Sequence, residues 1–297
     1  MNETNLKPKN LVIGVAANYS FEQLKPFLYS LKQTGYEGDV CFLVANLEAS
    51  TLRTLQALGV ITIPLGQRWL RKPLADWIDI STILSPPKKR QQIKFRTAAS
   101  SLSIFGSRFF DYYSFLLECG KAYSNVMLTD IRDVVFQRDP FDFDIDRQLC
   151  VFLEEITIKD CPYDSDWVIQ TFGRKGLKEL GDKIICCAGV TIGSYDSIIS
   201  YLKLMTDYMI RLRSKLSQLQ ICDQAVHNKI IYEDSLKELK IFRNRYAPVM
   251  TMGTMDKSMI QLDHEGFVLN DDGTIANVLH QYDRHLDIQE RLIKIYV

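Results

Sequence analysis

Charged side chains follow an apolar run near the middle of the chain. Residues 126–129 are mostly apolar, and Asp130, Arg132 and Asp133 come directly after them. Such a run is typical of a strand buried on both faces, and α/β proteins bind ligands beyond the carboxyl ends of their parallel strands. Because unpaired carboxylates in a dry site cost stability, we expect a positive partner here, and a divalent cation fits that role. An Asp–Arg pair that merely ends the strand explains the run equally well.

Two polar positions elsewhere in the chain could complete a metal site. His280 follows an apolar pair, and Asp223-Gln224 begins a short helix. Two carboxylates and one imidazole leave open coordination positions on Mn²⁺ or Mg²⁺, so we expect Asp130, Asp133 and His280 to hold one of these ions. A diphosphate would fill the open positions, and the ion would offset the charge that grows on a departing nucleoside diphosphate.

Two arginines are candidates for phosphate binding, because a guanidinium group binds phosphate in a bidentate manner. Arg132 lies between the two carboxylates, and Arg108 lies in the middle of an apolar helix expected over residues 98–119. Arg108 could instead extend its charged end to solvent. We expect His264 and His285 to be ordinary surface or hydrogen-bonded residues, and Glu154-Glu155 to be the solvated end of a strand.

The first part of the chain alternates between two periodicities. Apolar runs over residues 11–16, 39–45 and 60–63 predict strands, and the spacing of apolar residues between them predicts helices over residues 21–31 and 47–58. This alternation predicts a parallel sheet with right-handed crossovers. Neither a GxGxxG fingerprint nor a GxxxxGK[ST] phosphate loop follows the first strand.

The second part of the chain is predicted to be mixed. We expect strands over residues 149–153 and 184–192, helices over 164–180 and 197–218, and strand-like runs at 240–242 and 266–269. Apolar residues of the longest helix step by three and four over three heptads, which would allow homo-oligomerisation through residues 198–219. A single helix lying on the sheet is the preferred interpretation. Residues 69–96, with a basic run at 88–90, are expected to form a solvated loop, and a phosphate-binding loop is the alternative.

Composition indicates an ordinary soluble globular protein. The chain has 297 residues, of which 46% are hydrophobic and 24% are charged. Its 36 Lys and Arg balance its 36 Asp and Glu, so bulk charge does not suggest a nucleic-acid partner. No apolar run approaches the roughly 20 residues of a membrane span. Seven cysteines without a CxxC pair, mostly in apolar surroundings, are typical of buried thiols, so we expect a cytoplasmic protein.

Several of these segments together resemble a known family. The run TDIRDVVFQRDPF at 129–141 is similar to the TDxRDVVFQxDPF motif of a group of nucleotide-sugar-dependent glycosyltransferases with the GT-A fold. AGVTIG at 188–193 resembles the AG-x-x-x-G strand of that group, Asp223-Gln224 its DQ helix start, and HQYDR at 280–284 its C-terminal motif. The matches fall in the same order and span residues 12–284.

The resemblance implies a GT-A fold, in which a Rossmann-like, mostly parallel central sheet is flanked by helices and followed by a mixed C-terminal half. It implies one domain over residues 1–297, with a nucleotide-sugar-binding half at 10–141 and an acceptor-binding half at 142–297. The implied activity is hexosyl or pentosyl transfer from a nucleoside-diphosphate sugar, with UDP as the expected nucleotide. A divalent cation would assist, and the acceptor would be a hydroxyl group of a glycan, lipid or protein.

The resemblance also assigns residues to roles. The residues expected to contact the nucleotide sugar are Ala16, Ala17, Asn18, Arg108, Asp130, Arg132 and Gly189. Asp130, Asp133 and His280 would ligate the metal, and Asp223 and Gln224 would face the donor sugar or the acceptor as catalytic residues. The usual motif is Asp-x-Asp, whereas here Arg132 occupies the position of the second acid. Either Asp133 is the ligand after a local bend, or Arg132 partly replaces a cation.

Two other functions are compatible with these residues. A sugar-1-phosphate nucleotidyltransferase shares the sheet type and the use of a metal, but usually has a Gly-rich, basic loop after the first strand, which residues 14–20 lack. A non-catalytic nucleotide-sugar-binding or scaffold protein is the second alternative.

Overall fold

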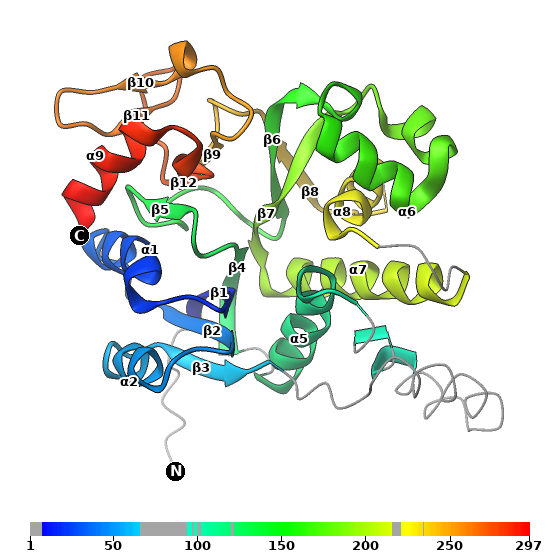
Figure 1. Ribbon diagram of the computed structural model, residues 1–297, viewed down its shortest axis with the longest axis horizontal. Coiled ribbons are helices and arrows are strands. Elements are labelled where there is room, and N and C mark those ends of the chain that lie inside the picture. The colour runs from blue at the N-terminus through cyan, green and yellow to red at the C-terminus, as the bar shows by residue number, and fades with distance from the viewer. Residues whose placement is uncertain are drawn as a thin grey trace.

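The computed structural model describes residues 8–65, 94–96, 98–99, 102–119, 122–215, 221–233 and 235–297 (Figure 1). The basic run at 88–90 and the end of the longest predicted helix lie outside these residues. Within the described part, no helix has both the length and the apolar character needed to cross a membrane.

A seven-stranded sheet forms the centre of the molecule, with strand order β3-β2-β1-β4-β7-β6-β8. Its strands are β1 (Lys9–Ala17), β2 (Asp39–Ala45), β3 (Ile61–Pro64), β4 (Tyr123–Thr129), β6 (Leu149–Thr157), β7 (Ile184–Ser194) and β8 (Leu239–Phe242). β1 pairs in parallel with β2 and β4, β2 with β3, and β6 with β8. β7 runs antiparallel to both β4 and β6. The predicted mostly parallel central sheet is therefore confirmed.

Helices cover both faces of this sheet because its strands alternate apolar side chains between two cores. Leu11 and Ile13 of β1 pack in one core with residues of α5 (Ile104–Cys119) and α7 (Tyr195–Lys215). Val12, between them, packs in the other core with residues of α1 (Phe21–Gln33) and α2 (Ala49–Ala57). The remaining helices of the second half are α6 (Pro162–Leu180), α8 (Asp223–Tyr232) and α9 (Leu286–Tyr296).

The described part of the longest helix lies on the sheet, as the preferred interpretation predicted. Ile198, Leu202, Met205 and Met209 are fully buried in the core that α7 shares with α5 and α8. The apolar stripe that suggested homo-oligomerisation is thus used within the chain over these residues. Leu216 and Leu219, which continue the stripe in the sequence, lie outside the described residues.

The C-terminal half is mixed, as predicted, and two of its strands form a second, three-stranded sheet with β5 (Val134–Phe136), which we call the small sheet. Its order is β5, β12 (Val278–His280) and β9 (Val249–Thr251). β12 is antiparallel to β5 and parallel to β9, which places His280 opposite Val134 and Thr251. The hairpin of β10 (Gln261–Leu262) and β11 (Val268–Leu269) lies near α9 (Figure 1). The small sheet thus joins the segment after β4 to the C-terminal part of the chain.

Gln137 fastens these two parts of the chain together. Its buried amide Nε2 donates to the carbonyls of Val268 (3.0 Å) and Ala276 (2.8 Å), and its Oε1 accepts from the Val268 N–H (2.7 Å). A single side chain therefore pairs with three buried backbone groups, of which the Val268 carbonyl also accepts from the Ala276 N–H (3.3 Å). This contact explains structurally why a polar Gln follows the apolar residues of β5.

Candidate active site

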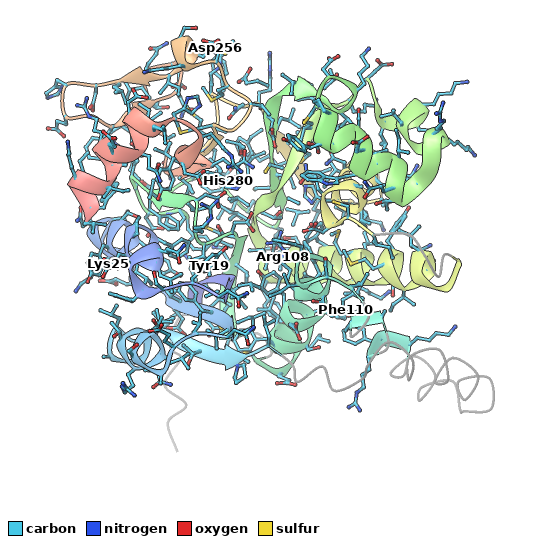
Figure 2. The ribbon with its side chains drawn as sticks, in the orientation of Figure 1. Tyr19, Lys25, Arg108, Phe110, Asp256 and His280 are labelled. Carbon is cyan, nitrogen blue, oxygen red and sulfur yellow. The ribbon has the colours of Figure 1, made fainter. Side chains whose placement is uncertain are left out.

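A cavity of about 1470 Å³ opens beyond the carboxyl ends of β1 and β4. It is lined by residues that follow these strands, by β7, by the starts of α5 and α8, by α6, and by the turn after β12. Figure 2 shows Arg108 and His280 in the middle of the molecule, whereas Lys25 and Asp256 lie near its margins. The cavity therefore lies where α/β sheets characteristically bind their ligands, and both halves of the chain contribute to it.

Asp130, Asp133 and His280 come together in this cavity. Each offers one possible ligand atom, and the three atoms lie within 4.8 Å of one another. Asp130 directly follows β4, Asp133 directly precedes β5, and His280 ends β12. The ladder between β5 and β12 sets Val134 opposite His280, and the Gln281 N–H donates to the Asp133 carbonyl (2.8 Å). The small sheet thus brings a distant imidazole to the two carboxylates, as the sequence predicted for a metal site.

Both ring nitrogens of His280 face polar groups. Burial opposes ionisation of this imidazole, but Cys187, Asp130 and Asp133 outweigh it and raise the pKa of His280 above its usual value, so a cation bound at Nε2 would replace a proton there. Nδ1 lies 3.4 Å from Cys187 Sγ and 3.5 Å from Thr251 Oγ1. Nε2 is buried without a hydrogen-bond partner and lies 3.7 Å from Asp130 Oδ2. A proton on Nδ1 leaves the Nε2 lone pair facing the carboxylates, and partners on the far nitrogen of this kind orient metal-binding histidines. An orphaned buried nitrogen beside two carboxylates fits a divalent cation.

Gly189 of β7 allows the imidazole and the carboxylate to approach so closely. A Cβ atom at this position would lie 2.4 Å from His280 Cε1, 2.6 Å from His280 Nε2 and 2.9 Å from Asp130 Oδ2. The Asp130 N–H also donates to the Gly189 carbonyl (2.7 Å). Gly189 therefore forms the floor of the ligand cluster, and any larger residue would occupy the space of its ligands.

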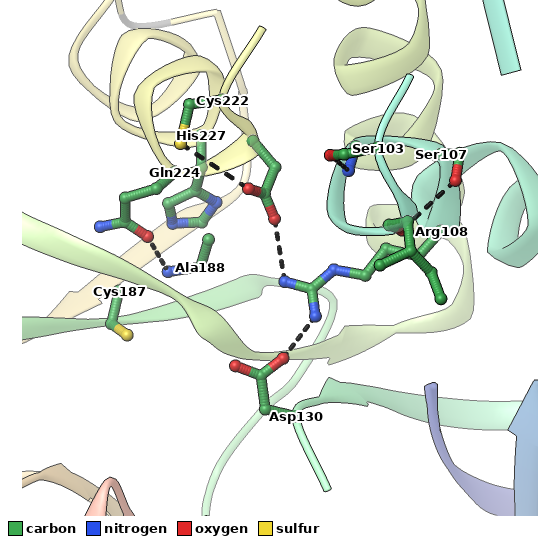
Figure 3. A network of polar contacts seen from close by, with 12 residues as sticks. Ser103, Ser107, Arg108, Asp130, Cys187, Ala188, Cys222, Gln224 and His227 are labelled. Carbon is green, nitrogen blue, oxygen red and sulfur yellow. Dashed lines mark hydrogen bonds and ion pairs between the residues drawn. The ribbon is translucent and has the colours of Figure 1, made fainter. Parts of the chain in front are cut away.

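Arg108 holds two acidic residues from different elements (Figure 3). It reaches from α5, forms an ion pair with Asp130 Oδ1, and places its other terminal nitrogen 3.0 Å from Asp223 Oδ2 at the start of α8. Arg108 is buried, so its charge is compensated by these two carboxylates. One oxygen of Asp130 thus meets Arg108, while the other faces His280.

The two ligand carboxylates have opposite electrostatic environments. Burial opposes ionisation of Asp130, but Arg108 and His280 outweigh it and hold the pKa of Asp130 well below its usual range. Burial raises the pKa of Asp133, and the neighbouring His280 only partly opposes that rise. Asp130 is therefore ionised under all ordinary conditions, whereas Asp133 carries a charge that an added cation would stabilise.

Arg132 does not take the place of the second acid. Its Nη1 lies 2.9 Å from Asp283 Oδ2, and its Nη2 lies 4.0 Å from Asp133 Oδ2. Asp133, rather than Arg132, belongs to the ligand cluster. Of the two arrangements that the motif allows, these contacts favour the one in which a bend after Asp130 brings Asp133 to the ligand position.

Gln224 supports the cavity wall from α8. Its Oε1 accepts from the Ala188 N–H (2.8 Å), and its Nε2 donates to the Cys186 carbonyl (3.0 Å). The side chain thus pairs with the backbone of β7 much as a neighbouring strand would. Both polar atoms have backbone partners, so Gln224 positions the start of α8, and with it Asp223, against the sheet.

The other predicted residues are divided between the cavity and the core. Ala17 and Asn18 line the cavity, and Asn18 has the left-handed backbone (φ 59°) that turns the chain out of β1. The side chain of Ala16 is fully buried in the core and does not line the cavity. His264 is exposed, and His285 Nε2 lies 3.0 Å from the Met252 carbonyl.

Glu154 is a cavity residue that the sequence analysis misjudged. It was expected at a solvated strand end, yet it is buried, lines the cavity and accepts a hydrogen bond from Thr254 Oγ1 (3.0 Å). Burial raises the pKa of Glu154 to about 7. Glu155 has the opposite environment and forms an ion pair with Arg245 at 3.0 Å. Successive strand residues point to opposite faces, and this period of two was the signal that one of the pair points inward.

Comparisons with known proteins find similar solved structures but no matching family or curated sequence. No model of a known protein family matches the chain, and no sequence of a curated protein matches it. A similar solved structure is that of Core-mannan synthase A from Aspergillus fumigatus in its Mn/GDP form. It has 12% sequence identity to this chain and a TM-score of 0.45, and the match covers 82% of this chain and 74% of that one.

Proposed function

We propose that the protein is a GT-A glycosyltransferase that moves a hexosyl or pentosyl group from a nucleoside-diphosphate sugar, with UDP as the expected nucleotide, to an acceptor hydroxyl. The observation that carries the proposal is the cluster of Asp130, Asp133 and His280 in a cavity at the carboxyl edge of the sheet. These are the three residues that the sequence resemblance assigns to a metal. The free, buried Nε2 of His280 supports that assignment independently of the resemblance.

The proposed ligands are Asp130, Asp133 and His280, and Mn²⁺ or Mg²⁺ bound there would offset the negative charge of the diphosphate leaving group. Arg108 keeps Asp130 ionised, while Cys187 and Thr251 lie beside Nδ1 of the imidazole and orient its ring. These residues form their contacts within the protein itself. The site is therefore largely preorganised, which favours stabilisation of charge as it develops.

Residues on either side of the metal cluster receive complementary roles. Ala17 and Asn18 would meet the base and ribose in the nucleotide-sugar-binding half, residues 10–141, with Arg132 and Gly189 beside the diphosphate. Asp223, held by Arg108, and Gln224 would face the donor sugar or the acceptor from the acceptor-binding half, residues 142–297. We further propose a reducing, cytoplasmic setting, since all seven cysteines are free thiols and most are buried.

Titration calorimetry tests the metal-dependent donor site. UDP and GDP are titrated into the protein with Mn²⁺ and, separately, with EDTA. We expect the metal to strengthen nucleotide binding to the parent protein and to the control variant His285→Ala. It should have little effect on nucleotide binding to His280→Ala, because of these two histidines His280 alone belongs to the ligand cluster. Equal affinity of the parent protein with Mn²⁺ and with EDTA would contradict the metal-bridged site.

A donor-hydrolysis assay separates the proposed activity from its alternatives. Slow release of nucleoside diphosphate from a nucleotide sugar is expected for a transferase that uses water in place of its acceptor. Formation of pyrophosphate from a sugar 1-phosphate and UTP would identify a nucleotidyltransferase instead. Nucleotide-sugar binding without either product would indicate a non-catalytic binding protein.

A further inference from the structure

One wall of the cavity is formed by residues of β6 and α6 and by the residue before α6, and we call it the α6 wall. Its members are Glu154, Cys161, Tyr163, Asp164, Trp167 and Gln170. The metal cluster and the α6 wall line the same cavity, so a ligand can contact both. The residues proposed to bind the nucleotide and the metal do not include Tyr163 and Trp167, the two aromatic members of this wall.

Two aromatic side chains of the α6 wall are exposed side by side. Tyr163 and Trp167 are one helical turn apart on α6, with ring centroids 6.2 Å apart and planes inclined at 37°. Tyr163 is 72% exposed and Trp167 37% exposed, although large aromatic side chains usually bury most of their surface. The pair therefore offers ring surface at the cavity that no described core cluster covers.

Buried carboxylates adjoin this aromatic pair. Glu154 and Asp164 are both buried, Glu154 accepts from Thr254 Oγ1, and burial raises the pKa of each carboxyl. None of the described residues of the α6 wall is Lys or Arg. Carboxylates are strong acceptors and form hydrogen bonds with the hydroxyl donors of a ligand. The wall is thus unfavourable for an anionic ligand and suited to one rich in hydroxyl groups.

We propose that the acceptor is a saccharide, and that the α6 wall binds its neutral terminal pyranose ring with Tyr163 and Trp167 against one face and Glu154 and Asp164 at its hydroxyls. The C–H groups on the face of a pyranose carry partial positive charge, which complements the negative face of an aromatic ring. A lipid chain would cover these buried carboxylates with apolar surface and bring no donor to their remaining acceptor positions, at a cost in free energy.

This inference rests on the proposed function, because it names the acceptor of the same reaction. In that transfer the acceptor hydroxyl oxygen forms a bond to the anomeric carbon of the donor. The bond between that carbon and the diphosphate oxygen breaks, the diphosphate leaves with the electron pair, and the hydroxyl proton is released to solvent.

Saturation-transfer NMR with simple saccharides tests the inference directly. The probes are methyl α- and β-pyranosides of glucose, galactose, mannose and N-acetylglucosamine, together with their common disaccharides, in the presence of UDP and Mn²⁺. We expect at least one probe to receive saturation from the parent protein. Affinity for that probe should fall by about 10-fold in Trp167→Ala and Tyr163→Ala and return toward the parent value in Trp167→Phe, because aromatic contacts contribute about 0.5–1.5 kcal/mol beyond area burial.

Tyr246→Ala is the matched control, since Tyr246 is 54% exposed and does not line the cavity. It should leave saccharide binding unchanged, and thermal melting checks that every variant is folded. Saccharide binding that is absent from the parent protein, or equally weakened in Tyr246→Ala, would overturn the inference.

Titration of UDP with Mn²⁺ into the same variants distinguishes the two proposals. Metal-dependent UDP binding without binding of any saccharide refutes the inference and leaves the proposed function standing. Saccharide binding that depends on Trp167 without metal-dependent nucleotide binding supports a sugar site at the α6 wall and refutes the proposed transferase. Transfer of sugar to a lipid or polypeptide at equal rates in the parent protein and Trp167→Ala would also overturn the inference.

Discussion

Substituting Gly189 by alanine should disrupt the ligand cluster while leaving the fold in place. The new Cβ would lie 2.4 Å from His280 Cε1, whereas non-bonded carbon atoms pack at about 3.5–4.0 Å, so the imidazole must move by roughly 1 Å. Metal ligands tolerate deviations of only about 0.2 Å. We therefore expect Gly189→Ala to weaken Mn²⁺ binding by about 10–100-fold, and overpacking to lower the free energy of unfolding by about 1–3 kcal/mol.

Urea denaturation without metal measures the stability change, and calorimetric titration of Mn²⁺ measures the affinity. Gly106→Ala is the control, because Gly106 lies in α5 near the cavity but the nearest atoms to its added Cβ are 3.5 Å away. It should leave Mn²⁺ affinity unchanged and raise stability by up to about 1 kcal/mol, since alanine is favoured over glycine inside a helix.

A double-mutant cycle tests whether the imidazole is the cause. Once His280→Ala has removed the ring, Gly189→Ala should cost little further stability, giving a coupling of about 1–3 kcal/mol between the two positions. Strictly additive losses, or a Gly189→Ala protein that binds Mn²⁺ like the parent, would show that the contact between Gly189 and His280 does not govern the site.

Three further predictions concern buried polar groups. Arg108→Met should lower the free energy of unfolding by about 3 kcal/mol in urea titrations, because Asp130 and Asp223 would be left without their shared cation; an unchanged midpoint would contradict this. Since the pKa of Glu154 is raised to about 7, the folded state retains a proton between about pH 4.5 and 7 that the unfolded chain releases, so stability falls as pH rises through this window. Glu154→Gln should remove that fall, so its free energy of unfolding should exceed that of the parent protein by up to about 3 kcal/mol at pH 8 but not at pH 4. Parallel pH profiles of stability for the two proteins would refute the assignment. Gln137→Leu should lower the free energy of unfolding by about 2 kcal/mol or more in urea denaturation, because the Ala276 carbonyl and the Val268 N–H lose the Gln137 amide, and a smaller loss would mean that water replaces it.

The sheet and the ligand cluster were predictable because their signals are local. Apolar runs marked the strands, and charged residues at the end of the run over 126–129 marked the site of Asp130 and Asp133. His280 was a candidate third ligand from its residue type, and the family resemblance supported it, but the pairing of β12 with β5 that brings it to the carboxylates leaves little trace in either strand alone. The antiparallel direction of β7 was not predicted for the same reason, since an apolar run indicates burial but not direction.

The side chains that contact and orient the proposed ligands could not be predicted from the sequence. Residues 281–284 are polar and follow His280 directly in the chain, which makes them the obvious candidates from sequence to orient its ring. In the structure that position is taken by Cys187 and Thr251, from two other strands, while Gln281 has left-handed backbone (φ 56°) that takes the chain out of β12. Arg108 likewise proved to join two acids from α8 and the end of β4, a pairing that only the folded packing of α5 could reveal.

The small sheet makes ion affinity sensitive to strand register. His280 meets the carboxylates because β12 pairs with β5 in the one alignment that sets Val134 opposite His280. A slip of one residue along this ladder would turn the imidazole to the opposite face, although the short apolar strands could remain paired. A compact but misregistered chain would then retain much of its secondary structure and still fail to hold the ion. Binding of the proposed ion would therefore distinguish the native alignment of β12 from alignments shifted by one residue, and its binding free energy would stabilise the native alignment alone.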